Sequence, residues 1–98
     1  MASRQNLDRE LVANLERTFS AFREAVMKLK VDETFRSAAK VRSEIARGKY
    51  NNGLLSFEDW DVIESDLISR QKNYLQSKRD RVVAEAEWRA ALDGGVYR

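Results

Sequence analysis

The chain has 98 residues, of which 43% are hydrophobic and 35% charged, with a formal net charge of +2. This length suits a single domain, and no apolar run approaches the roughly 18 residues that a membrane-spanning helix needs. The sequence contains no cysteine and no histidine, which excludes disulfides, thiol nucleophiles and the commonest soft-metal ligands. We therefore expect no metal site and no cofactor.

The first predicted element is a long helix over residues from about 4 to 50. Residues 3–47 contain neither proline nor glycine, the two strongest helix breakers. Apolar residues recur in alternating steps of three and four, which is typical of a coiled-coil seam. They are Val12, Leu15, Phe19, Phe22, Val26 and Leu29. The stripe then continues on a shifted face through Val31, Phe35, Ala38 and Ile45.

The second predicted element is a tip turn over residues from about 51 to 55. Gly53 is expected to adopt a positive φ where the first helix ends, because glycine has no Cβ to oppose that conformation. Gly48 leaves two alternatives open. It either ends the helix early, or lies within a helix that continues to Asn51.

The third predicted element is a helix over residues from about 56 to 93. Ser56 is a favourable N-cap, and Asp59 stands three residues later at the spacing of a capping box. Leu55 and Trp60 have the positions of a hydrophobic staple. Two apolar stripes follow along this helix. One comprises Trp60, Ile63, Leu67 and Tyr74, and the other Ile68, Leu75 and Val82.

Charge and apolar spacing together predict an all-α fold, an antiparallel two-helix coiled-coil hairpin with long helices. The first segment has ten basic and seven acidic residues, and the second has six and nine, so folding back places opposite charges side by side. An antiparallel register centred on the tip would set Ile45 opposite Trp60, Val31 opposite Tyr74, and Phe22 opposite residues 82–83. Apolar side chains remain on further faces. We therefore expect the isolated hairpin to self-associate.

The tip sequence resembles that of TolC-like outer-membrane efflux proteins. From Tyr50 to Trp60 it has an aromatic residue, two variable residues, Gly-Leu, a small polar residue and an aspartate that opens the return helix. The ending from Leu92 to Gly95 is similar to the end of that family's second repeat. Three positions depart from the family pattern. Asp93 stands in place of a glycine, Trp60 in place of an aliphatic residue, and Leu55 in place of a side chain that is often basic or polar.

The resemblance implies a function in export. In that family three protomers close a periplasmic α-barrel below an outer-membrane β-barrel, and hairpin tips dock end-on with a periplasmic adaptor, or membrane fusion, protein. It assigns Gly53, Leu54 and Leu55 to the docking tip. It assigns Tyr50, Ser56 and Asp59 to the channel entrance.

The resemblance also implies a location, the periplasmic part of an outer-membrane protein. We expect no signal peptide at Met1-Ala2-Ser3, because the apolar core of such a segment does not follow. We also expect no membrane-barrel strands, because segments of about ten residues with alternating hydrophobicity are not found. We therefore expect it to be one hairpin excised from a longer channel.

Three other classes of function are alternatives to this hypothesis. A cytosolic coiled-coil adaptor or regulatory hairpin would show the same heptads, and would tolerate substitution of the tip. Nucleic-acid binding is not expected, because the basic run at residues 78–81 is interrupted by Asp80 and followed by Glu85 and Glu87. An enzyme is not expected either, because a two-helix rod without histidine or cysteine has no group poised for acid–base or nucleophilic chemistry.

Overall fold

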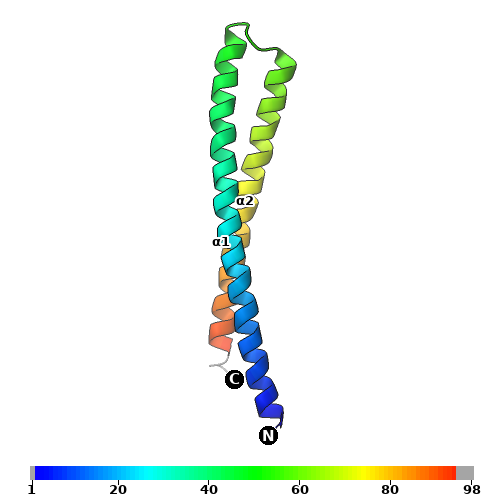
Figure 1. Cartoon of the computed structure of the whole chain (residues 1–98), viewed down its shortest axis with the longest axis vertical. Coiled ribbons are helices and arrows are strands. Elements are labelled where there is room, and N and C mark those ends of the chain that lie inside the picture. Colours follow the sequence, from blue (N-terminus) through cyan, green and yellow to red (C-terminus); the bar gives the residue numbers. More distant parts are fainter. Residues whose placement is uncertain (1, 95–98) are drawn as a thin grey trace. The chain divides into compact units, whose positions relative to one another are not determined.

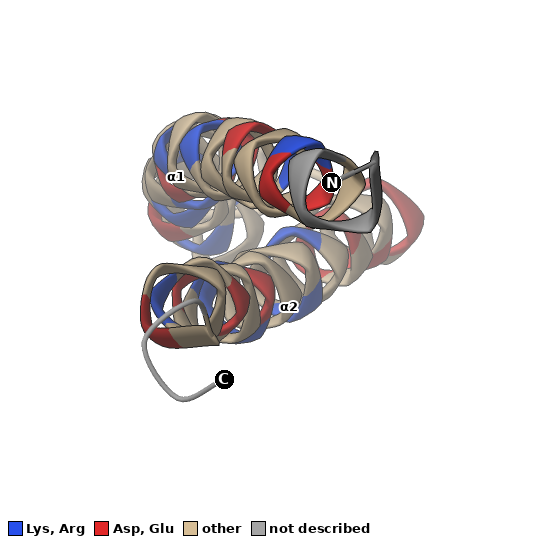
Figure 2. Cartoon of the chain, turned by 90° about the horizontal axis from the view of Figure 1, so that it is seen from below, with Lys and Arg blue, Asp and Glu red and all other residues tan. Residues whose placement is uncertain are grey.

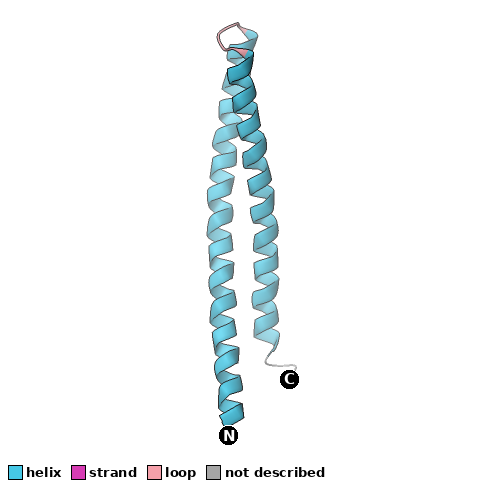
Figure 3. Ribbon diagram, turned by 90° about the vertical axis from the view of Figure 1, so that its right-hand side faces the viewer, coloured by secondary structure: helices cyan, strands magenta, loops and turns pink. Residues whose placement is uncertain are grey.

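The computed structural model describes residues 2–94 as two α-helices joined by a short turn (Figure 1). Helix α1 comprises Ala2–Asn51 and helix α2 comprises Phe57–Gly94. Within residues 2–94 the only other structure is the turn, without any strand (Figure 3). The predicted fold class is confirmed, since the chain is an antiparallel helical hairpin of coiled-coil type. Gly95, part of the predicted repeat ending, lies outside the described residues.

Contacts divide the hairpin into two units, and each contains a segment of both helices. The tip unit is Lys28–Lys78, and the terminal unit contains the described parts of residues 1–27 and 79–98. In residues 2–94 neither helix has a stretch long and apolar enough to cross a membrane. Basic and acidic residues are interspersed along both helices (Figure 2).

A 3,4-spaced row of buried and half-buried side chains runs along each helix and forms the seam. This spacing is the one that two packed helices require. In the tip unit the row comprises Leu29, Asp32, Arg36, Ala39, Ser43 and Ala46 on α1, and Trp60, Ile63, Leu67, Arg70, Tyr74 and Ser77 on α2. In the terminal unit it comprises Leu11, Leu15, Thr18, Phe22 and Ala25 on α1, and Arg81, Ala84, Trp88 and Ala91 on α2.

The most deeply buried residues of this seam are all small. They are Thr18, Ala39, Ser43, Ala46, Ser77 and Ala91. Small side chains let two helix backbones approach closely, because interaxial distance depends on the side chains at the contact. The larger apolar residues consequently lie beside the seam or away from it.

In the terminal unit the seam is centred on three aromatic rings. Trp88 stacks on Phe22, with ring centroids 5.5 Å apart, and contacts Phe19 at 5.3 Å. The predicted pairing of Phe22 with residues 82–83 is therefore wrong, since Val82 and Val83 are 56% and 50% exposed. The indole of Trp88 buries more apolar area than a valine can, and aromatic pairs add stabilisation beyond that area.

In the tip unit a polar layer interrupts the seam. Asp32 accepts hydrogen bonds from Ser77 Oγ and from Lys28 Nζ, the latter at 2.9 Å. These two hydrogen bonds, that of Ser77 first, lower the pKa of the Asp32 carboxyl below its ordinary value. Nearer the tip Ser43 donates a hydrogen bond to Glu64. The Ser77–Asp32 and Ser43–Glu64 bonds join α1 to α2. Each satisfies a polar group that a wholly apolar seam would leave unpaired.

Large apolar side chains form further stripes outside the seam. Of the predicted first stripe, Leu15, Phe22 and Leu29 are half-buried, whereas Val12, Phe19 and Val26 are 54%, 42% and 40% exposed. The predicted pairings of Val31 and Ile45 are wrong, because these residues are 51% and 56% exposed. Ala39, Ser43 and Ala46 occupy the seam in their place. On α2, Ile68, Leu75 and Val82 are all more than half exposed.

Candidate docking site at the hairpin tip

Helix α1 ends in a Schellman motif built on Gly53. Leu54 N donates to Lys49 O at 2.8 Å, and Gly53 N donates to Tyr50 O at 3.0 Å. Gly53 has a φ of 72°, and it is the one positive φ in the described chain. The predicted conformation of Gly53 is thus confirmed, and the motif satisfies carbonyls that the helix end would leave without donors.

Gly48 lies inside α1, so the second of the two alternatives is correct. The helix continues through it to Asn51, and its carbonyl accepts a bond from Asn52 N at 3.2 Å. A Cβ built on Gly48 would meet nothing within 4 Å. The position therefore needs glycine neither for backbone conformation nor for packing within this chain.

Helix α2 begins with the predicted N-cap. Asp59 N donates to Ser56 Oγ at 3.1 Å, and Trp60 N donates to Ser56 O at 3.0 Å. Glu58 and Asp59 lie in the first turn, where their charges complement the positive end of the helix dipole. Ser56 thus satisfies a backbone N–H that the start of α2 would otherwise leave without an acceptor.

Three aromatic rings pack against one another below the turn and join the two helices. Tyr50 of α1 stacks on Trp60 of α2, with centroids 5.2 Å apart and planes inclined by 16°. Phe57 contacts Tyr50 at 6.3 Å and Trp60 at 5.9 Å. Because these rings come from both sides of the turn, their contacts join the end of α1 to the start of α2.

The apolar residues of the tip differ sharply in exposure. Leu54 is 75% exposed and Phe57 58% exposed. Leu55 is half-buried, and it lines a shallow groove with Ala46 and Ile63. Of the two leucines predicted to dock, Leu54 is therefore the more exposed.

Opposite charges flank these apolar residues. Arg47 and Lys49 belong to the last turns of α1, whereas Glu58, Asp59 and Asp61 belong to the first turns of α2, and all five are exposed. One side of the tip is therefore basic and the other acidic.

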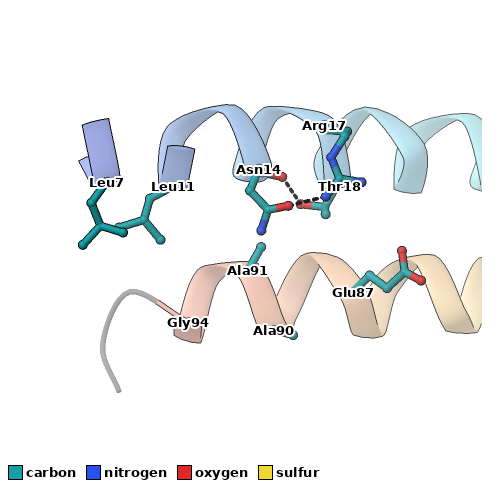
Figure 4. A pocket seen from close by; sticks show the side chains of 9 residues that line it. All are labelled: Leu7, Leu11, Asn14, Arg17, Thr18, Glu87, Ala90, Ala91 and Gly94. Carbon is teal, nitrogen blue, oxygen red and sulfur yellow. Dashed lines mark hydrogen bonds between the residues drawn. The ribbon is translucent and has the colours of Figure 1, made fainter. Parts of the chain in front are cut away.

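The terminal unit also has a groove, but the side chains that line it give little indication of a binding or catalytic site. Its volume is about 640 Å³, and its lining includes Leu7, Leu11, Ala90 and Ala91 (Figure 4). Thr18 Oγ1 donates to Asn14 O at 2.8 Å, so its hydroxyl is engaged within α1. Across the described residues no three acidic side chains group as metal ligands would. The tip remains the better candidate.

Comparison with protein-family models, with curated proteins and with solved structures finds no match to this chain. The candidate site therefore stands on the tip sequence and its geometry. Sequence reasoning assigned no role to Phe57. The signal that could have indicated one is an aromatic residue directly after the N-cap, a position whose side chain lies beside the turn rather than in the seam.

Proposed function

We propose that the chain is a periplasmic α-hairpin of a TolC-like outer-membrane efflux channel, and that its tip docks onto the hairpin tip of a periplasmic adaptor protein. The resemblance of residues 50–60 to that family motivates the proposal. Gly53 and Leu54 are its central residues. Leu55 adds apolar surface behind them.

The observation that carries the proposal is the exposure of Leu54. In a Schellman motif the residue after the left-handed glycine commonly packs back onto the last turns of its own helix. Leu54 occupies that position and is 75% exposed. An apolar side chain held outwards by a rigid turn suits contact with a partner better than it suits stability of the turn.

Gly53 serves the same contact in two ways. Its φ of 72° is strained for residues with a Cβ, and the absence of a side chain lets another backbone approach the tip closely. In the assembled channel Tyr50, Ser56 and Asp59 would line the entrance. Three protomers would supply the ring of tips.

The test is export by the channel that carries this hairpin. Gly53→Trp adds bulk at the point of contact, so we expect export to be abolished while the protein still folds and reaches the outer membrane. Lys78→Gln, at the opposite end of the tip unit, is the matched control and should export normally. Normal export by the Gly53 variant would show that the tip only connects the two helices. It would favour the alternative function, a cytosolic coiled-coil adaptor or regulatory hairpin.

A further inference from the structure

Phe57 has an exposure that its contacts within the chain do not explain. Its ring lies against Tyr50 and Trp60, yet the residue remains 58% exposed. It stands three residues after Leu54, on the other side of the N-cap. Leu54 and Phe57 are therefore the two most exposed apolar residues between Tyr50 and Trp60, and they lie on either side of Ser56.

Contacts with Tyr50 and Trp60 hold the Phe57 ring in place before any partner binds. Tyr50 and Trp60 stack on each other from the two helices, and both touch the Phe57 ring. A side chain already held in place loses less conformational freedom when a partner covers it. The exposed part of the ring is then available for apolar burial, which contributes about 25 cal/mol per Å².

The charges around this apolar pair constrain the partner. Residues 47–51 of α1 carry two basic and no acidic side chains, whereas residues 57–64 of α2 carry four acidic and no basic ones. A partner that matches both sides needs an acidic group and a basic group spaced as two adjacent helix ends. A bilayer with anionic headgroups does not match, because the carboxylates of α2 would repel it.

We propose that Leu54 and Phe57 together form the docking surface, and that its occupant is the end of another antiparallel helical hairpin. That hairpin meets the tip head-on, with an acidic helix end over Arg47 and Lys49 and a basic helix end over Glu58 and Asp61. This inference rests on the proposed function, and adds to it a second anchor residue and a fixed orientation.

Site-specific photocross-linking in cells tests this surface. The intact channel carries a benzophenone amino acid at position 54 or 57, with position 35 as the control. Phe35 is also an exposed phenylalanine, at 47%, but its ring is covered by the Arg70 guanidinium 4.7 Å away. Mass spectrometry of the captured peptide identifies the partner and its segment. We expect positions 54 and 57 to capture the hairpin tip of an adaptor, and position 35 not to do so.

The alternative outcomes separate the two proposals. Capture of the adaptor from position 54 alone would overturn the role of Phe57 and leave the proposed function standing. Capture from neither position would overturn both. Capture of lipid, or of a second copy of the channel, from position 57 would overturn the assigned occupant.

Binding of the channel to that adaptor measures the contribution of Phe57. Phe57→Ala should weaken binding at least tenfold, whereas Phe35→Ala should change it less than twofold. The unfolding midpoint of each variant, followed by circular dichroism, separates docking from stability. A loss of binding by Phe57→Ala that is matched by Phe35→Ala, or that only follows a lowered midpoint, would overturn the proposal.

Charge reversal tests the orientation. Lys49→Glu should weaken binding at least threefold at low ionic strength, and the difference should shrink as salt screens the exposed charges. Lys72→Glu is the control, because Lys72 is exposed on α2 away from the tip. Equal binding by the two reversal variants at low salt would overturn the proposed orientation.

Discussion

At the scale of single residues, the two glycines near the end of α1 have different physical roles. Gly53 adopts a left-handed conformation that closes the helix, whereas Gly48 lies in regular helix with open space around it. Glycine in a helix interior is destabilising relative to alanine by roughly 0.5–1 kcal/mol. The tip therefore contains one glycine required by conformation and one that lowers helix stability.

Gly48→Ala should accordingly increase the free energy of unfolding by about 0.5–1 kcal/mol. Denaturant unfolding of the 98-residue chain, followed by circular dichroism, measures the change. Gly53→Ala is the matched control and should decrease stability by about 1–2 kcal/mol, because a Cβ opposes its positive φ. If both substitutions stabilise the chain, the assigned end of α1 is wrong.

Asp32 gives the stability of the tip unit a dependence on pH. The Ser77 and Lys28 hydrogen bonds lower its pKa in the folded state from the usual 3.8. Stability from a carboxyl with a depressed pKa is fully present above the unfolded pKa, and is lost as the pH falls through the folded pKa.

Asp32→Asn should therefore be less stable than the parent chain at pH 7, and this difference should narrow below about pH 4. Urea unfolding at a series of pH values checks it. A difference that stays constant from pH 7 to pH 3 would show that the ionised carboxyl contributes nothing.

Residues with local roles could be predicted from the sequence, whereas a residue whose role depends on contacts across the turn could not. The positive φ of Gly53 and the cap at Ser56 follow from short-range chemistry, and both were predicted correctly. The exposure of Phe57 depends on how Tyr50 and Trp60 meet across the turn. No pattern within a single helix contains that contact.

At the scale of the helices, the seam is narrow and its shielded positions include many small or polar residues. The 3,4 spacing correctly predicted two long helices, but it did not decide which apolar stripe faces inwards. Helix α1 carries Leu15, Phe22 and Leu29 beside Val12 and its heptad partners, and both sets have coiled-coil spacing. Close packing of alanine, serine and threonine decides which face of each helix lies in the seam. A count of apolar residues does not reveal this packing.

The same packing predicts unequal costs of truncation along α2. Trp88→Ala removes contacts with two phenylalanine rings and should cost about 2 kcal/mol or more of unfolding free energy. Leu75→Ala, at a residue 59% exposed, should cost less than about 0.5 kcal/mol. Both are measured by urea unfolding at low protein concentration. Equal losses would show that the seam has been assigned to the wrong face.

At the scale of the whole molecule, the apolar stripes outside the seam remain exposed to solvent. Contiguous exposed apolar residues on a soluble chain commonly mark an interaction surface. In the proposed channel, neighbouring hairpins would cover them. The isolated chain has only other copies of itself for that purpose.

We therefore expect the isolated chain to self-associate as its concentration rises through the micromolar range. Sedimentation velocity should show dimers or larger species, because burying the stripe of Ile68, Leu75 and Val82 removes apolar surface from water. Leu75→Glu should shift this equilibrium towards monomer, whereas the exposed polar substitution Lys72→Gln should not. A strict monomer at high micromolar concentration would contradict the expectation.

The central claim is that the tip docks an adaptor, and multivalent binding tests it most directly. The chain is displayed in three copies on a trimeric scaffold, and binding to the hairpin domain of a periplasmic adaptor is measured by surface plasmon resonance. A single tip offers a small contact, so useful affinity should appear only when several tips bind together. The account predicts binding by the trimeric display that Gly53→Trp and Leu54→Asp each abolish. Binding that survives both substitutions, or that never appears with the parent tip, would contradict it.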